Sequence, residues 1–275
     1  MLRLPHRLAT LSVAPLATAP LAAAFIAMFS LPLAATPAHA ATVGPQTLHG
    51  RTLELEGLVA NVEITVSSSA KEITVSANGT DDQVNRLSFH TEGDKAKVEQ
   101  EHRHHEHYSD RDFMTVTITL PAGTGLAVSD FVGDLTAGDL NADLAVDDLH
   151  SGSITVGRVQ AASLDVTGSG NIAVGDIAKA TSVEINGSGK VRTGKTTGEV
   201  SLEISGSGNV DMASVNGSVS AEIHGSGNVT IHAGKADPLS VDISGSGDFT
   251  MDGVAANQSI SQHGSGQVHV RNPGH

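Results

Sequence analysis

The residues best suited to chemistry lie close together in residues 101–112, which read EHRHHEHYSDRD. Imidazole and carboxylate groups are ligands for Zn²⁺, Ni²⁺ and Cu²⁺ in proteins. The candidate metal ligands are His102, His104, His105 and His107. In an extended strand alternate residues share a face, so one ion could bind all four only if the segment bends. A bend is expected because the segment would be the tip of a hairpin, and the alternative is a solvated polar tip without a metal.

A second set of candidates is a series of acidic residues that recurs every 19 or 20 positions. Its members are Asp165, Glu184, Glu203, Glu222 and Asp242, and Ser261 takes the sixth place. Each lies between two apolar residues, so on a strand it would face outward. If the strands stack in register, the carboxylates lie about 4.8 Å apart and repel one another. Two alternatives stay open: the side chains splay into water, or they form a strip that binds divalent cations or a basic ligand.

Catalysis would make this chain a carbohydrate-active enzyme, such as a polysaccharide lyase or a glycosidase. Paired carboxylates can serve as acid and base in such enzymes, and Asp147 and Asp148, beside His150, are the best candidates. Neighbours on a strand point to opposite faces, however. The chain has no Trp and a single Tyr to stack on sugar rings, and it has no cluster of basic residues for an anionic sugar. We therefore expect no enzyme activity and no catalytic residue.

A repeat marked by the tripeptide GSG must position the acidic residues. The tripeptide starts at Gly168, Gly187, Gly206, Gly225, Gly245 and Gly264. Alternating apolar residues precede and follow it, as in Leu202/Ile204 and Val210/Met212, and two degenerate units precede the first copy. A unit of this length holds two short strands but no helix, and it buries its apolar face only when units stack. The sequence predicts an all-β parallel solenoid of about eight coils in residues 122–275.

The twelve GSG glycines are expected at the corners of the coils, where glycine supplies positive φ. They are Gly168, Gly170, Gly187, Gly189, Gly206, Gly208, Gly225, Gly227, Gly245, Gly247, Gly264 and Gly266. The serine between them can bond the neighbouring backbone. A phosphate-binding loop would need a following helix with a lysine, and a calcium-binding roll would need its motif every nine residues.

Polar residues recur on both sides of each GSG tripeptide. The column just before it holds Thr167, Asn186, Ser205, His224, Ser244 and His263, and the column after it holds Asn171, Lys190, Asn209, Asn228, Asp248 and Gln267. Such columns in solenoids are expected to form hydrogen-bonded ladders. His224 and His263 are two coils apart, which is too far to share an ion.

The repeated unit, seen in the sequence EISGSGNVDM, resembles the GIN-domain family of GSG-repeat β-helix proteins, the head domains of autotransporter-like adhesins of bacterial envelopes. Residues 114–138, MTVTITLPAGTGLAVSDFVGDLTAG, are similar to the lead-in of related adhesin repeat proteins. The resemblance covers residues 45–275. It implies a right-handed β-helix and a role in the periplasm or at the cell surface, and it implies no catalytic residues.

The region before the repeat has two parts. Residues 1–40 combine two arginines, an apolar run and the small-x-small triplet AHA, and we interpret them as a signal peptide that is cleaved after Ala40. Residues 41–121 alternate without the 19-residue register. We expect them to form an antiparallel β-rich cap without a helix that covers the first coil.

Composition limits the partners. The net charge of −14 at pH 7 repels nucleic acid, and no segment after the signal is long and apolar enough to span a membrane. The expected function is a non-enzymatic, exported, adhesin-like or envelope interaction module in the periplasm or at the cell surface, with an envelope, glycan or protein ligand. The alternatives are the carbohydrate-active enzyme above, with a β-helix fold, and a periplasmic metal-binding protein that uses the His-rich segment. No cofactor is expected beyond a divalent cation, and the final coil is expected to fray or to form a homo-oligomer.

Overall fold

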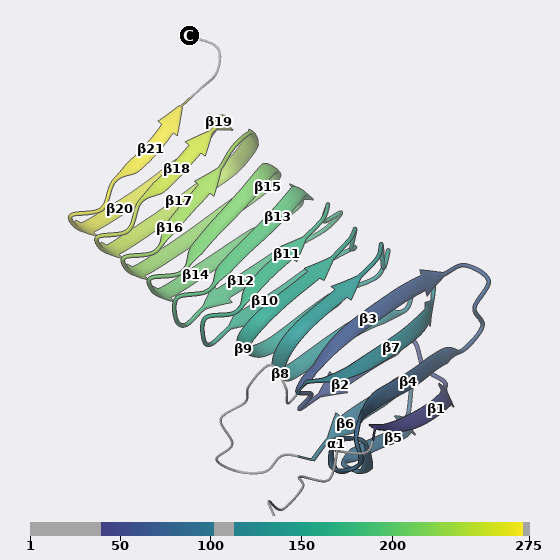
Figure 1. The fold of residues 1–275 in the computed structure, drawn as a ribbon. Coiled ribbons are helices and arrows are strands. Elements are labelled where there is room, and N and C mark those ends of the chain that lie inside the picture. The colour runs from purple at the N-terminus through teal and green to yellow at the C-terminus, as the bar shows by residue number, and fades with distance from the viewer. Residues whose placement is uncertain (1–39, 102–112, 272–275) are drawn as a thin grey trace, which may run out of the picture. The chain divides into compact units, whose positions relative to one another are not determined.

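The computed structural model describes residues 40–101 and 113–271, which are mostly β-strands (Figure 1). The chain divides into two compact units, Met1–Pro37 and Ala38–His275, and the fold described below is that of the second unit. This unit is a β-solenoid of about eight turns, which confirms the predicted fold class.

The N-terminal part of the described chain contains a helix and seven strands. They are β1 (Ala40–Leu48), β2 (Thr52–Glu56), β3 (Ala60–Ser67), β4 (Ile73–Thr80), α1 (Asp81–Asn85), β5 (Leu87–Glu92), β6 (Lys95–Gln100) and β7 (Met114–Pro121). The repeat follows as β8 (Gly125–Ala137), β9 (Leu144–Val156), β10 (Ala162–Val166), β11 (Asn171–Val174), β12 (Thr181–Ile185), β13 (Lys190–Thr197), β14 (Val200–Gly206), β15 (Asn209–Gly225), β16 (Asn228–Ile231), β17 (Gly234–Gly245), β18 (Phe249–Asp252), β19 (Val254–Ala255), β20 (Gln258–Gly264) and β21 (Val268–Arg271).

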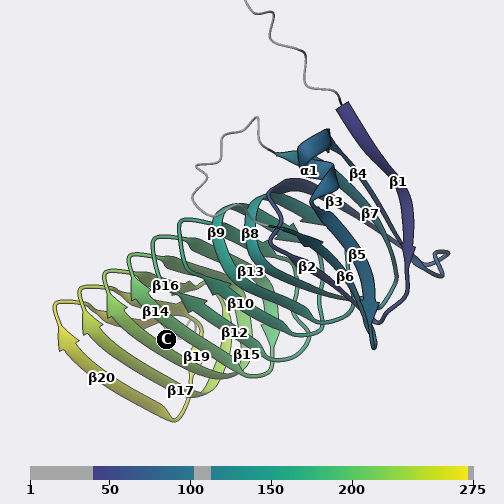
Figure 2. The same cartoon turned by 90° about the horizontal axis from the view of Figure 1, so that it is seen from below.

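Each GSG coil has a first side before the tripeptide and a second side after it. On the first side β10, β12, β14, the end of β15, β17 and β20 stack in parallel, so that Leu164 pairs with Val183 and Val183 with Leu202. On the second side β11, β13, the start of β15, β16, β18 and β21 stack in the same way. Figure 2 shows the first-side strands side by side. The 19-residue period thus places equivalent residues of successive coils on neighbouring strands.

The apolar residues of each strand point into the coil. In β14, Leu202 and Ile204 are 2% and 0% exposed, whereas Glu203 between them is exposed. Burying such a side chain contributes about 1.5–3 kcal/mol to folding, and each coil covers the open core of its neighbour. Stacking therefore stabilises coils that could not fold alone.

A short third side closes each coil, which the sequence did not predict. Val159 bridges to Ile177, and Ile177 to Thr196. These residues are buried and form an inner column of their own. One inward residue per coil is too short a signal for strand periodicity.

The expected cap is in part solenoid. β2 and β3 pair in parallel with β8, and β6 and β7 pair in parallel with β2 and β3, so these strands form two further rungs. Antiparallel pairing is found between β1 and β4, β4 and β7, and β5 and β6. The expectation of an antiparallel segment therefore describes only its outer strands.

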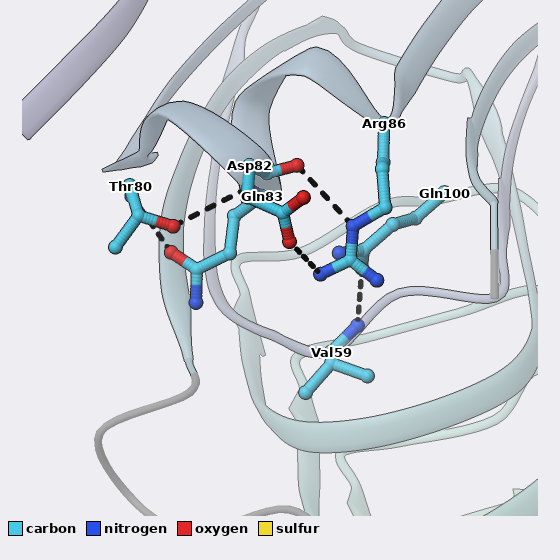
Figure 3. Close-up of polar contacts among 6 residues, drawn as sticks. All are labelled: Val59, Thr80, Asp82, Gln83, Arg86 and Gln100. Carbon is cyan, nitrogen blue, oxygen red and sulfur yellow. Dashed lines mark hydrogen bonds and ion pairs between the residues drawn. The ribbon is translucent and has the colours of Figure 1, made fainter. Parts of the chain in front are cut away.

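The expectation that residues 41–121 contain no helix is wrong, because α1 lies between β4 and β5. Thr80 caps the helix: its Oγ1 accepts a hydrogen bond from Gln83 N, and Thr80 N donates to Gln83 Oε1 at 2.8 Å (Figure 3). Arg86 Nη2 lies 3.2 Å from Asp82 Oδ2, one turn away. The reciprocal capping box of Thr80 and Gln83 satisfies two backbone donors that a short helix would leave exposed.

Candidate binding surface

The five acidic residues predicted to stack do so on the first side; we call Asp165, Glu184, Glu203, Glu222 and Asp242 the acidic column. The strand register pairs each of them with the next, and Asp242 with Ser261. All but Asp165 are exposed, and Asp165 is partly buried. Asp147 follows Val146, which pairs with Leu164, so it continues the column by one coil. Six carboxylates thus follow one another on adjacent strands.

The acidic column has no ion pair with any described residue, and this sets it apart from the neighbouring rungs. In β6, Lys97 Nζ lies 3.6 Å from Glu99 Oε2 and also contacts Glu56, whose hydrogen bond raises the pKa of Lys97. Lys97 therefore offsets part of the negative charge of Glu56 and Glu99. Along the GSG coils the carboxylates repeat as like charges on adjacent strands, and Glu184 Oε1 accepts a hydrogen bond from Asn186 Nδ2 at 2.7 Å.

Asp165 is the most perturbed member of the column. Burial raises its pKa first, and the charges of Glu184, Asp148 and Asp147 raise it further. Its Oδ1 atom is buried and has no hydrogen-bond partner among the described residues. The ionised form of Asp165 is therefore disfavoured in the folded protein.

A column of serines runs beside the acidic column. Its members are Ser163, Ser182, Ser201, Ser220, Ser240 and Ser259, which pair in register. A shallow groove of about 460 Å³ crosses the starts of the first-side strands from Thr52 to Ser201 and includes the first three serines. The first side thus presents parallel rows of hydroxyl and carboxylate groups.

The polar column after GSG forms the expected hydrogen-bonded ladder from Asn209 to Gln267, whereas the described residues show no side-chain hydrogen bond between successive members of the column before GSG. Asn228 donates from N and Nδ2 to Asn209 Oδ1 at 3.2 and 3.0 Å. Asp248 N donates to Asn228 Oδ1 at 3.0 Å, and Gln267 N to Asp248 Oδ1 at 2.9 Å. These side chains satisfy backbone donors at the corners, which is a structural role.

A column of alternating charge on the third side was missed from the sequence. Arg158 donates from Nε and Nη2 to Asp139 Oδ2 at 3.0 and 2.8 Å, and Lys195 N donates to Asp176 Oδ1 at 2.9 Å. The hydrogen bond from Arg158 N, followed by those from its guanidinium, lowers the pKa of Asp139. The near-19-residue spacing of these residues was the available signal. Opposite charges alternate here, unlike in the acidic column.

The GSG corners depend on two different constraints. Positive φ in the left-handed range occurs at Gly206, with φ 142°, and at three other first glycines, but at none of the second glycines. At Gly208 the constraint is space, because a Cβ atom would overlap Ile185 Cγ2 and lie 2.9 Å from Gly189 O. The serine acts through its backbone: Ser207 N donates to Gly187 O at 2.9 Å. The described structure gives the Ser207 hydroxyl no hydrogen bond, contrary to expectation.

The four histidines His102, His104, His105 and His107 lie outside the described residues. The strands on either side of this segment, β6 and β7, are not paired as the expected hairpin. β6 stacks on the first side and β7 on the second, and the two do not pair with each other in the described structure. β6 and β7 therefore belong to two sides of one rung. Within residues 40–101 and 113–271, no three His, Asp or Glu residues are placed to hold a metal ion.

Asp147, Asp148 and His150, the candidates for the alternative of catalysis, are not assembled into a site. His150 Nε2 lies 2.9 Å from Asp130 Oδ1, and its Nδ1 lies 3.3 Å from Thr167 Oγ1. No hydrogen bond or ion pair joins His150 to Asp147 or Asp148 in the described part of the chain. The imidazole instead links three successive coils at a corner.

In the parts of the chain that the structure describes, no helix has the length and hydropathy to cross a membrane.

Several solved structures share this fold. A "putative adhesin" from Parabacteroides distasonis ATCC 8503 is 17% identical, with 85% of this chain and 98% of that chain covered and a TM-score of 0.61. A "putative lipid binding protein" from the same organism is 18% identical, with 84% and 96% covered and a TM-score of 0.63. A "putative adhesin" from Parabacteroides merdae ATCC 43184 is 17% identical, with 84% and 95% covered and a TM-score of 0.57. At this identity the likeness shows the fold alone.

Sequence comparison gives the family. No curated protein sequence matches the chain significantly. The family described as "Putative auto-transporter adhesin, head GIN domain" matches residues 54–235, which is more than half of the 275 residues. The match includes the first rungs and the first four GSG corners. The chain therefore belongs to this head GIN-domain family, as the resemblance of its GSG repeat predicted.

Proposed function

We propose that this chain is a non-enzymatic, exported binding module that acts as an adhesin-like protein at the cell envelope. The family description supports the adhesin class. The observation that carries the proposal is the first side, where the acidic column and the serines form exposed rows in register. Such rows offer a ligand many weak, repeated contacts, whereas a catalytic site needs a few groups that converge on one atom.

The ligand class follows from the charges on that side. The acidic column is not neutralised by described basic residues, so it favours a protein or glycan that carries cationic groups. Export is supported by the expected signal in residues 1–40. The periplasm and the cell surface both fit this arrangement.

Binding of Ala38–His275 to arrays of envelope glycans and matrix proteins tests the proposal. The informative variant is Glu184→Gln/Glu203→Gln/Glu222→Gln, which removes three charges from the acidic column. The matched control is Glu63→Gln/Glu92→Gln/Glu101→Gln, which removes three exposed charges elsewhere. We expect the column variant to lose at least roughly tenfold in affinity and the control to retain it. Equal affinity of the two variants, or turnover of any bound glycan, contradicts the proposal.

A further inference from the structure

The last described coil, β20 and β21, is an open edge of the sheet (Figure 1). β20 pairs with β17 and β21 with β18, and no described strand pairs with their other sides. The coils before it have a neighbour on both sides, as β14 has β12 and β15. The unpaired backbone groups of an edge are a template for another strand.

The same edge exposes apolar side chains that are buried in other coils. Ile260 is 47% exposed, whereas its register partner Val241 is 1% exposed. Val268 and Val270 are partly exposed, whereas their register partners Phe249 and Met251 are 0% exposed. Gln262 replaces an inward apolar residue and donates to Gly266 O, which covers only part of this surface. The edge therefore combines free backbone groups with exposed core residues.

The last coil also differs from the rest of the chain in charge. The chain has a net charge of −14, but residues 258–271 contain no Asp or Glu. The acidic column stops at Asp242, where the next place is Ser261, and the second-side ladder changes from Asp248 to Gln267. Two acidic molecules could therefore approach through this coil without carboxylates facing each other.

Among the described strands at the opposite end of the solenoid, the free edges are β1 and β5, which lie outside the rungs, so no rung is open there for head-to-tail stacking. β2 and β3 are covered by β6 and β7, which pair in turn with β5 and β4. The matching free edge on a second copy is the same last coil. We propose that two copies of this chain pair through β20 and β21 about a two-fold axis, which continues the sheet and buries Ile260, Val268 and Val270. The interface is self-complementary, because the same surface serves both copies.

Sedimentation of Ala38–His275 across nanomolar to high micromolar concentration tests the pairing. We expect a monomer–dimer equilibrium. Ser261→Glu extends the acidic column to the edge, so dimerisation should weaken by roughly tenfold through like-charge repulsion, and less at high salt. Ser261→Gln is the neutral control. Ser182→Glu adds the same charge to an exposed position in an inner coil, and both controls should dimerise like the parent chain.

Hydrogen exchange gives a readout that needs no variant. In the dimer the amides of β20 and β21 become paired, so their protection should rise with protein concentration while that of β12 stays constant. A strict monomer at all concentrations overturns the proposal. So does a dimer that Ser261→Glu leaves unchanged, or protection of β20 and β21 that does not depend on concentration.

Discussion

At the scale of single residues, the two glycines of a GSG corner are needed for different reasons. Gly206 has φ 142°, and a Cβ there would lie 2.5 Å from Gly187 O; Gly208 has no such φ but lacks space beside Ile185. We expect Gly206→Ala to lower the free energy of unfolding by about 1–3 kcal/mol because it combines backbone strain with a clash. Gly208→Ala should also destabilise, whereas Ser207→Ala, at an exposed position, should not. Chemical denaturation checks this, and an unchanged midpoint for Gly206→Ala would exclude the strained corner.

Asp165 leads to a prediction about pH. Its pKa in the folded protein is raised above the ordinary value of 3.8, so the folded state binds its proton more tightly than the unfolded state does. Ionisation of Asp165 therefore costs stability, and the cost is present at neutral pH and disappears as pH falls below 3.8. Asp165→Asn should raise the melting temperature at pH 7, with a gain that shrinks progressively towards pH 3.8. Glu203→Gln, in the same column, is the variant with which the melting temperature of Asp165→Asn is compared. A gain in melting temperature for Asp165→Asn that grows on acidification would contradict the predicted direction of the pH dependence.

At the scale of elements, one coil has an unusually polar interior. Thr181, Thr193 and Thr196 all belong to the coil of β12 and β13, and their buried Oγ1 atoms have no hydrogen-bond partner among the described residues. Thr193 lies between Val174 and Met212 in the register. We expect Thr193→Val to raise the free energy of unfolding by about 1 kcal/mol, because it removes an unpaired buried hydroxyl at nearly constant volume.

The control for this prediction is Thr155→Val in β9, the same change at an exposed position. It should alter stability by less than about 0.5 kcal/mol. If both variants behave alike, the hydroxyl of Thr193 finds a partner in solution and this coil is no weaker than its neighbours.

The elements also show what the sequence could and could not predict. The six GSG copies predicted the strands, their inward residues and the acidic column, because a fixed repeat length specifies which residues of successive coils lie in register. The rung of β6 and β7 was mistaken for a hairpin, since alternation identifies a strand but not its partner. Helix α1 was missed although residues 80–83, TDDQ, spell a capping box. The third side was missed because residues such as Val159 and Ile177 stand alone.

At the scale of the whole molecule, charge is distributed unevenly among the sides of the solenoid. On the third side Asp139, Arg158, Asp176 and Lys195 alternate in sign, and the guanidinium of Arg158 is attracted to both Asp139 and Asp176. On the first side the acidic column repeats one sign. The stack therefore carries a built-in repulsion along one side, and packing of the apolar core must outweigh it. Screening by salt should relieve this repulsion, because the carboxylates are exposed and closer together than a Debye length.

This imbalance predicts how stability depends on salt. We expect the melting temperature of Ala38–His275 to rise by a few degrees, on the order of 2–5 °C, between 10 mM and 300 mM NaCl. Glu184→Gln/Glu203→Gln/Glu222→Gln should raise the melting temperature at low salt and lose most of the salt dependence, since the repelling charges are gone. Glu63→Gln/Glu92→Gln/Glu101→Gln changes the net charge equally but should keep the salt dependence of the parent chain. Calorimetry on the three proteins at constant protein concentration checks this. If the two triple variants respond to salt identically, net charge rather than the acidic column governs the stability of the solenoid.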